Sequence, residues 1–412
     1  MMIKAPPQHI AMSQFSVRNN NLVMGGMALS QLVQRVGSTP FYAYDRQLIT
    51  NRMAELRQAM PADLKIHYAL KANPMPAVVQ HMANIVDGFD LASAGEMKVA
   101  LDTIMRPENI SMAGPGKRPQ ELSQAIAAGI TINIESFHEL ETIAQLSEKT
   151  GIQARVMVRI NPAFELKASG MKMGGGPKQF GIDEEQLPTV LKRIQALNLD
   201  FQGFHIYSGS QNLSAAAISE AQQKSIHLAI TLAEYCPAPL KKLNIGGGYG
   251  IAYFPGDTAL NIHQVGNALA ESMAYLKTEQ PQADVIIELG RYLVGEAGIY
   301  VCQIIDKKTS RGQTFLVADG GLHHHLAASG NFGQVLRKNY PVAIGNKMAV
   351  SEKEVVSIVG PLCTPLDILA DKMELPIAEI GDFVVVYQSG AYGFTASPHQ
   401  FLSQPSCVEV LV

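Results

Sequence analysis

Eight short apolar segments, each followed by a stretch with helical spacing, recur between residues 65 and 291. This alternation limits the fold more than any other feature of the chain. The segments are KIHYALKAN, IVDGFDLAS, ISMAGPG, TINIES, ARVMVRINP, FQGFHIYSGS, LNIGGGYG and DVIIELGR. Strands that alternate with helices form a parallel sheet covered by the helices. We therefore predict an α/β fold with a closed (β/α)8 barrel over residues 40–290, and a doubly wound open sheet is the alternative.

The pattern changes after residue 291, where strand-like runs follow one another with turns but few helical stretches between them. The runs are EAGIYVCQII, TFLVADG, KEVVSIVG, DFVVVYQSG and SCVEVLV. We predict a C-terminal all-β domain over residues 291–412. Residues 1–39 contain a strand-like piece before the first amphipathic helix, and we expect this N-terminal segment to contribute to the β domain. Two domains suit a chain of 412 residues, because a single core rarely grows that large.

Composition excludes several classes of protein. The net charge of -3 provides no broad basic field, so we expect no nucleic-acid partner. The cysteines show neither a CxxC pair nor metal-ligand spacing, which argues against a disulfide framework and a zinc site; they are Cys236, Cys302, Cys363 and Cys407. Neither a signal peptide nor a long apolar span is evident, so we expect a cytoplasmic protein without a membrane segment.

Residues suited to chemistry follow the predicted strands, at the end where barrel enzymes place their active sites. Lys71 follows the first strand and is expected to project into the barrel mouth, although a lone lysine at a strand end is more often a surface residue. Gly246, Gly247 and Gly248 end the seventh strand. Backbone without side chains can surround a phosphate there, whereas three glycines alone also make a simple turn.

Two acidic residues, Asp90 and Glu288, also end apolar strands, where a buried charge requires a cationic partner. A protonated pyridine nitrogen would suit one of them. His205 could lie against the face of such a ring while Ser208 donates to a phosphate. In isolation His205 would more often be structural, and Arg159 could equally be the partner in a structural ion pair.

The order of these motifs resembles the barrel family that contains alanine racemase, eukaryotic-type ornithine decarboxylase and diaminopimelate decarboxylase, from about Pro40 onward. The matching segments are YALKAN, GFDLASAGE, RINP, HIYSGSQ, NIGGGYG, ELGR, GPLCTPLD and SGAYGF. The chain is most similar to a diaminopimelate decarboxylase-like branch. The resemblance implies a PLP-dependent amino-acid decarboxylase, a carboxy-lyase that removes CO2 from the α-carbon, and a place in lysine biosynthesis.

The resemblance also implies roles for individual residues. Lys71 would hold pyridoxal 5'-phosphate as a Schiff base, Glu288 would pair with the pyridine nitrogen and His205 would stack on the ring. Arg291, Thr364 and Tyr392 would contact the substrate, and Cys363 would act with Lys71 and His205 in catalysis. The implied cofactor site comprises Lys71, Asp90, Arg159, His205, Ser208, Gly246, Gly247, Gly248, Glu288, Gly290, Arg291 and Tyr392.

In decarboxylases of this family the cysteine comes from the partner subunit, so the resemblance implies a homodimer with shared active sites. The alternative for Cys363 is a buried small hydrophobic residue. A racemase would need a second catalytic tyrosine, and the cysteine motif argues against it. A non-catalytic regulator would be expected to have lost Lys71 or the phosphate glycines, and both are present.

The substrate is less constrained, because two elements depart from the family pattern. The residue after the cysteine, acidic in the ornithine and diaminopimelate enzymes, is Thr364 here, and another carboxylate such as Asp367, or an ordered water, is the alternative source of that contact. The Arg-Pro-x-x-Tyr element expected after Asp319 is absent, and Arg337 would replace its arginine only if the intervening segment folds back. The alternative substrate is a glutamyl-type aminoacyl group carried by an acyl-carrier protein, which would then be a partner.

Three consecutive histidines follow Asp319, and they invite a metal interpretation. They are His323, His324 and His325. Successive side chains of a strand point to opposite faces, so at most two of the three rings could share a site there. We therefore expect no metal and interpret the triple as part of a loop or an interface.

Overall fold

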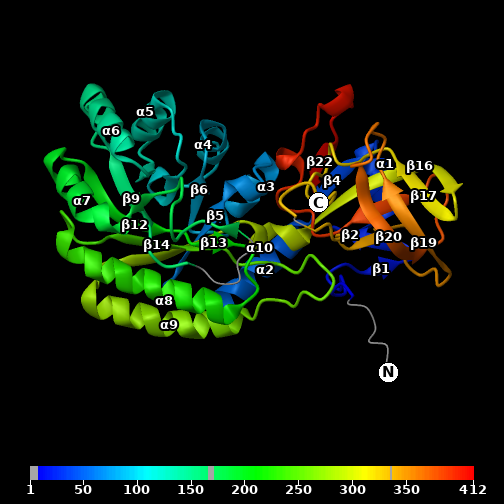
Figure 1. The fold of residues 1–412 in the computed structure, drawn as a ribbon, viewed down its shortest axis with the longest axis horizontal. Coiled ribbons are helices and arrows are strands. Elements are labelled where there is room, and N and C mark those ends of the chain that lie inside the picture. The colour runs from blue at the N-terminus through cyan, green and yellow to red at the C-terminus, as the bar shows by residue number, and fades with distance from the viewer. Residues whose placement is uncertain (1–7, 166–170, 335) are drawn as a thin grey trace. The chain divides into compact units, whose positions relative to one another are not determined.

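The computed structural model describes residues 8–165, 171–334 and 336–412, and the chain divides into two compact units. The barrel unit comprises Arg52–Ile251 and Ala259–Tyr292. The β unit comprises Met1–Asn51, Ala252–Thr258 and Leu293–Val412. Helix α2 (Arg46–Ala59) begins in the β unit and ends in the barrel unit. The ribbon in Figure 1 shows the helices gathered mainly in the barrel unit.

Eight parallel strands close into a ring in the barrel unit. They are β5 (Lys65–Ala69), β6 (Gly88–Leu91), β7 (Ile110–Met112), β8 (Thr131–Ile134), β9 (Arg155–Asn161), β12 (Asp200–Ile206), β14 (Lys242–Gly247) and β15 (Asp284–Leu289). They follow the order β9, β12, β14, β15, β5, β6, β7, β8, and the pairing of β8 with β9 closes the ring. This closure confirms the predicted barrel and excludes the open doubly wound sheet.

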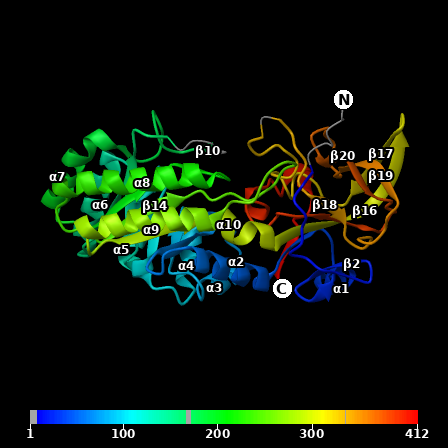
Figure 2. The same ribbon diagram turned by 90° about the horizontal axis from the view of Figure 1, so that it is seen from below.

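Helices lie outside the ring and connect successive strands (Figures 1 and 2). They are α3 (Pro76–Met82), α4 (Ala94–Leu101), α5 (Pro119–Ala128), α6 (Phe137–Thr150), α7 (Leu187–Ala196), α8 (Ala215–Leu232) and α9 (Ile262–Glu279). The short α10 (Arg291–Val294) follows the last barrel strand. Helices α8 and α9 pack side by side. Short strands also leave the ring: β11 (Ile182–Asp183) pairs with β9, and β10 (Met171–Lys172) pairs with β13 (Gly209–Ser210).

Local sequence explains how these helices begin. Ser136 Oγ accepts a hydrogen bond from the Glu139 amide at 3.1 Å, while the Glu139 carboxylate accepts one from the Glu135 amide at 2.7 Å. This reciprocal arrangement satisfies amides that the first turn of α6 leaves unpaired. Ser93 and Glu96 begin α4 in the same way. Both helices therefore start immediately after a barrel strand, which fixes the loops at the carboxyl end of the barrel.

The β unit is built from a mixed sheet and a small antiparallel sheet. The mixed sheet contains β4 (Phe41–Tyr44), β16 (Gly298–Ser310), β17 (Gln313–Ala318), β18 (Val342–Ile344), β19 (Lys353–Val359), β20 (Ile368–Pro376), β21 (Phe383–Val386) and β22 (Val408–Leu411). The small sheet contains β1 (Val17–Arg18), β2 (Asn21–Met24) and β3 (Met27–Ala28), followed by α1 (Leu29–Val36). A separate, mainly β domain was predicted and is confirmed.

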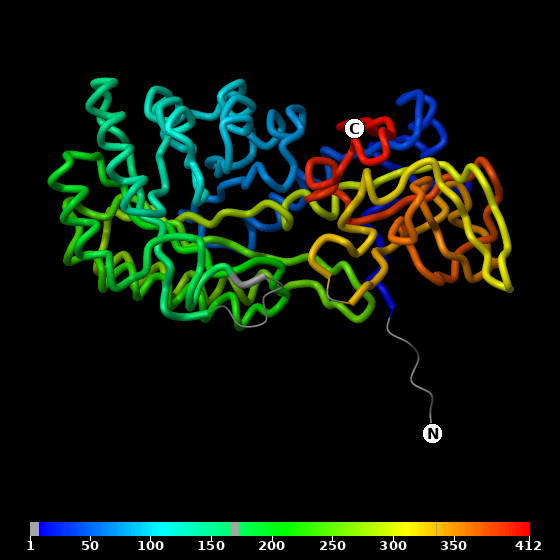
Figure 3. The backbone as a smooth tube through the Cα atoms, turned by 45° about the horizontal axis from the view of Figure 1, so that its top comes forward, coloured from blue at the N-terminus to red at the C-terminus, as the bar shows by residue number. Residues whose placement is uncertain are grey.

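The N-terminal segment belongs to the core of the β unit. Strand β4 pairs antiparallel with β16 and parallel with β22, so that chain from both ends shares one sheet (Figure 3). Apolar side chains of the N-terminal segment pack with those of β4, β16 and β21 in one buried cluster, which consists of Phe15, Leu22, Met24, Leu29, Leu32, Phe41, Ala43, Ile299, Val301, Val385 and Tyr387. Burial of this set is the main force that holds the N-terminal segment in the β unit. No helix in the described residues is long and apolar enough to cross a bilayer.

Candidate active site

Lys71 lies just beyond the first barrel strand. It occupies a short 3-10 helix, Leu70–Ala72, that begins where β5 ends. The side chain is exposed, and its Nζ lies 5.3 Å from the centre of the Tyr207 ring, which directly follows β12. The amine is therefore at the carboxyl end of the barrel, where a small molecule can reach it.

A buried carboxylate, Glu288 of β15, lies among polar side chains inside the barrel. His205 Nε2 of β12 is 3.3 Å from Glu288 Oε2, and Asn244 Nδ2 of β14 donates to the same oxygen at 3.1 Å. Burial alone would raise the pKa of Glu288, but the His205 ring, Lys71 and Arg159 together hold this pKa below its usual value. Glu288 is therefore ionised at neutral pH and suits a cationic ring nitrogen.

The three glycines at the end of β14 are required by close backbone packing. Gly246 and Gly248 have φ values of 69° and 77°, a region that L side chains rarely adopt. A methyl group on Gly247 would lie 2.0 Å from the Glu288 carbonyl oxygen, and one on Gly248 would lie 2.1 Å from that of Gly209. The glycine loop therefore packs directly against β15 and the segment after β12, and its bare backbone can approach a phosphate.

Three other predicted residues lie on segments beside this loop. Ser208 is buried between β12 and β13, next to Gly209. Gly290 follows β15, and a methyl group there would lie 2.6 Å from Ala72 Cβ, so this glycine allows the end of β15 to approach the Lys71 turn. Arg291 starts α10 and is half-buried. The barrel thus brings the predicted phosphate and lysine segments to one end.

Among the described residues, Asp90 has no lysine or arginine partner, although its burial led us to expect a cation. Its Oδ1 accepts a short hydrogen bond from Ser111 Oγ on β7. Its Oδ2 lies 3.6 Å from His67 Nδ1 on β5, and neither of these two atoms has a hydrogen-bond partner among the described residues. His67 was missed by the sequence analysis, although its position two residues before Ala69 places it on the inner face of the strand.

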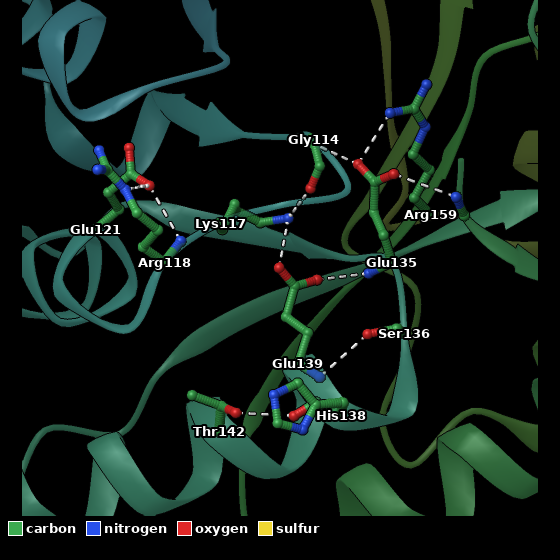
Figure 4. A network of polar contacts seen from close by, with 11 residues as sticks. Gly114, Lys117, Arg118, Glu121, Glu135, Ser136, His138, Glu139, Thr142 and Arg159 are labelled. Atoms are coloured by element: carbon green, nitrogen blue, oxygen red, sulfur yellow. Dashed lines mark hydrogen bonds and ion pairs between the residues drawn. The ribbon is translucent and has the colours of Figure 1, made fainter. Parts of the chain in front are cut away.

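Arg159 of β9 is buried and paired with Glu135, which follows β8. Arg159 Nη1 donates to Glu135 Oε1 at 2.9 Å, and the guanidinium carbon lies 4.9 Å from the centre of the Phe180 ring. Burial opposes ionisation of Glu135, but Arg159 and Lys117 together hold the pKa of this carboxyl below its usual value. The ion pair is therefore formed at neutral pH. Figure 4 shows it within a larger polar network.

The remaining predicted residues belong to the β unit. Cys363 and Thr364 lie between β19 and β20, and Tyr392 follows β21 with a φ of 53°. Cys363 is exposed, unlike the other cysteines, so the alternative of a buried small hydrophobic residue is wrong. An exposed thiol is free to approach another molecule.

The two charged residues considered as replacements, Asp367 for the missing acid and Arg337 for the missing arginine, are engaged within the β unit. Both oxygens of the buried Asp367 accept backbone hydrogen bonds, from Leu322 at 2.6 Å and from Leu362 at 2.9 Å. Arg337 donates to the Ile368 carbonyl at 2.6 Å, so the segment after β17 does fold back against this loop. Asp367 therefore fastens the Cys363 loop to that segment instead of offering a free carboxylate.

The three consecutive histidines are buried; the ring centres of His323 and His324 lie 3.8 Å apart, but the three rings have different hydrogen-bond partners. His325 contacts Ser389 Oγ at 2.9 Å, and His324 contacts the Pro405 carbonyl at 2.8 Å and the Tyr300 hydroxyl at 3.3 Å. Among the described residues, His323 has no hydrogen-bond partner at either ring nitrogen. The three histidines lie in a turn between β17 and β18 and not in a strand.

One ligand-type atom each from His324, His399 and Cys407 lies within 4.8 Å of the other two. This grouping is a candidate for a metal site within the described part of the chain. Both ring nitrogens of His324, however, already face the Pro405 carbonyl and the Tyr300 hydroxyl, and burial raises the pKa of the Cys407 thiol to about 12. We therefore assign no ion to it.

Comparison with known proteins agrees with this geometry. The family model "Pyridoxal-dependent decarboxylase, pyridoxal binding domain" matches residues 46–295. An L-glutamyl-[BtrI acyl-carrier protein] decarboxylase of Niallia circulans is 38% identical over 379 residues, which cover 90% of this chain and 88% of that protein. Diaminopimelate decarboxylase of Aquifex aeolicus is 32% identical over 402 residues, covering 96% and 91%.

The fold is shared with solved structures over nearly the whole chain. The crystal structure of diaminopimelate decarboxylase from M. jannaschii superimposes with a TM-score of 0.87 at 25% identity, covering 97% of this chain and 92% of that one. The matched family model spans more than half of the chain and includes Lys71, Glu288 and the glycine loop. The chain therefore belongs to the pyridoxal-dependent decarboxylases, and its cofactor is pyridoxal 5'-phosphate.

Proposed function

We propose that this decarboxylase holds its cofactor through Lys71 and uses Glu288 and His205 to control the cofactor ring. The observation that carries the proposal is an ionised, buried Glu288 close to His205 at the same barrel end as an accessible lysine. These residues fit the cofactor, because a protonated ring nitrogen would give Glu288 its cationic partner. Gly246–Gly248 and Ser208 would hold the phosphate.

Each residue then has a definite task. The Lys71 amine would hold the cofactor and, once free of it, would serve as a nearby acid or base. Glu288 would keep a proton on the ring nitrogen, while His205 would support the ring face. When bound, the cofactor accepts the electron pair that remains on the α-carbon after CO2 departs. Cys363 would return a proton to that carbon from the partner subunit of a homodimer, for which an exposed thiol is suited.

We further propose that the substrate has no free ammonium group at its distal end. Thr364 is neutral, and Asp367 and Arg337, the charged groups beside it, are engaged with backbone groups. A distal ammonium would lose a charge-assisted hydrogen bond worth about 1.5–3 kcal/mol. A glutamyl-type group linked to a carrier protein meets this requirement, and a relative 38% identical acts on such a group.

Diaminopimelate is the second candidate, since several relatives and structural neighbours are diaminopimelate decarboxylases. Racemisation is less well supported, because the relatives described above are decarboxylases. Turnover of diaminopimelate would place the enzyme in lysine biosynthesis. The carrier-linked alternative would instead make an acyl-carrier protein its partner.

The experiment that separates the two substrates uses Thr364→Glu, with Thr364→Gln as its uncharged control of equal size. We expect Thr364→Glu to raise kcat/KM for diaminopimelate by about 10- to 100-fold, and Thr364→Gln to leave it nearly unchanged. Wild-type kcat/KM for diaminopimelate above about 10⁴ M⁻¹s⁻¹ would contradict the proposal. CO2 release from carrier-linked glutamate by the wild type would support it.

A further inference from the structure

Arg159 depends on one carboxylate for its position. Among the described residues, Glu135 is the only side chain that hydrogen-bonds it, and both side chains are buried. A buried guanidinium that loses its only charged partner is strongly destabilised. Arg159 is also the register neighbour of His205 in the adjacent strand β12. The Glu135–Arg159 pair thus lies next to the residues that we assign to the cofactor.

Glu135 is itself held from several directions (Figure 4). Its Oε1 accepts from the Gly114 amide at 2.5 Å as well as from Arg159, and its Oε2 accepts from the Gly181 amide at 3.2 Å. Its own amide donates to Glu139, whose other oxygen pairs with the buried Lys117 at 2.7 Å. The carboxylate therefore has little freedom to move, and neither does the guanidinium that it binds.

The charge of Arg159 influences the ionisation of Glu288, which we assign to the cofactor site. His205, the register neighbour of Arg159, lies 3.3 Å from Glu288 Oε2, so Arg159 is one strand away from the ring that contacts this carboxylate. In agreement with this placement, Arg159 and Lys71 both lower the pKa of Glu288. Other charged or titratable groups near these residues are His205 beside Glu288, Glu96 beside Lys71, and Lys117 and Glu139 beside Glu135. Glu135 is the anion in direct contact with Arg159, so its charge determines how strongly Arg159 acts on the others.

We propose that Glu135 is a positioning residue of the cofactor site, which fixes Arg159 and offsets its positive charge. It thereby helps to keep a proton on the nitrogen that joins Lys71 to the cofactor. The inference rests on the proposed attachment at Lys71. If Glu135 became neutral, the uncompensated guanidinium would repel that proton.

The test is Glu135→Gln, which keeps the size and one hydrogen-bond acceptor but removes the charge. The measurement is a pH titration of the visible absorbance of the bound cofactor in the holoenzyme. We expect the midpoint to fall by about one pH unit, because a nearby charge shifts a pKa by roughly 1–3 units. The matched control is Glu139→Gln, which removes a charge from the same network without touching Arg159. It should lower the melting temperature and leave the midpoint unchanged.

A second pair of variants tests whether Glu135 acts through Arg159. In Arg159→Met the guanidinium is gone while the Gly114 and Gly181 amides still hold Glu135. If Glu135 acts through Arg159, adding Glu135→Gln to Arg159→Met should lower the midpoint by much less than one pH unit. This comparison also applies if Glu135→Gln alone does not fold. An unchanged midpoint in folded Glu135→Gln, or a full pH unit between Arg159→Met and Glu135→Gln/Arg159→Met, would overturn the inference. If the wild-type absorbance survived in Lys71→Ala, the proposed attachment would have failed instead.

Discussion

Acidification should destabilise the β unit through its three consecutive histidines. All three are buried, and burial lowers the pKa of His323 and of His324 to about 4 and that of His325 to about 3, from 6.5 in an exposed chain. The folded state therefore binds fewer protons than the unfolded state as the pH falls below 6.5. Folding stability that is fully present above pH 6.5 is lost progressively as the pH approaches 4.

The expected magnitude follows from linkage. A group with a pKa of 6.5 when unfolded and about 4 when folded loses about 2 kcal/mol of stability between pH 8 and pH 5. The three rings together could remove up to about 6 kcal/mol, which is comparable with the total stability of many domains. The loss of stability should therefore begin below about pH 6.5, at a higher pH than the titration of exposed carboxylates near about pH 4.

The assay is urea unfolding followed by circular dichroism at pH 8, 6.5 and 5 in wild type, His323→Phe and His263→Gln. His323 is suited to replacement because neither of its ring nitrogens has a hydrogen-bond partner among the described residues. His323→Phe should reduce the loss of stability between pH 8 and pH 5 by about 2 kcal/mol. His263→Gln, at an exposed position on α9, should not. A loss of less than about 1 kcal/mol in the wild type would refute the reasoning.

Three further predictions concern the active site. Lys71→Ala should abolish covalent attachment of the cofactor, because only a primary amine can form that link, and borohydride reduction followed by mass spectrometry would detect attachment at any other lysine. Mixtures of inactive Lys71→Ala and Cys363→Ala should regain activity in up to about a quarter of sites if two subunits share each site, and no recovery after demonstrated subunit exchange would contradict the shared site. Gly247→Ala should weaken cofactor binding and reduce the free energy of unfolding by about 1–3 kcal/mol, because the added methyl group would lie 2.0 Å from the Glu288 carbonyl oxygen. An unchanged melting temperature and an unchanged cofactor dissociation constant would refute this prediction.

The barrel was predictable because its pattern is local. Six of the eight strands fall within the apolar segment identified for them, and β12 and β14 begin one residue before theirs. Several of the strands end close to a residue suited to chemistry. Parallel strands bring their carboxyl ends to one side, so residues far apart in the sequence, such as Lys71, His205 and Glu288, are gathered without any knowledge of their contacts. The order of motifs then identified the family.

Partners across the barrel could not be predicted, because no local pattern encodes which side chains meet. Asp90 and Glu288 both looked like buried anions that require cations, yet Asp90 meets Ser111 and His67. Glu135 also ends a barrel strand, but it was overlooked because its partner Arg159 belongs to a different strand and had been assigned to the cofactor. The sequence thus indicated where charges lie, whereas the register between β8 and β9 determines which of them pair.

The difference between position in the sequence and contact in the fold also affects the substrate that we propose. From the sequence, Asp367 was a candidate to replace the acidic residue missing at Thr364, since it lies only three positions away. In the fold its carboxylate binds the Leu322 and Leu362 amides. A distal ammonium that competed for Asp367 would have to break one of these hydrogen bonds and leave a buried amide unpaired, at a cost of about 1–3 kcal/mol. Although Asp367 is close to Thr364 in the sequence, its carboxylate therefore does not replace the missing acidic residue. A substrate with a neutral distal group fits better than one with a distal ammonium.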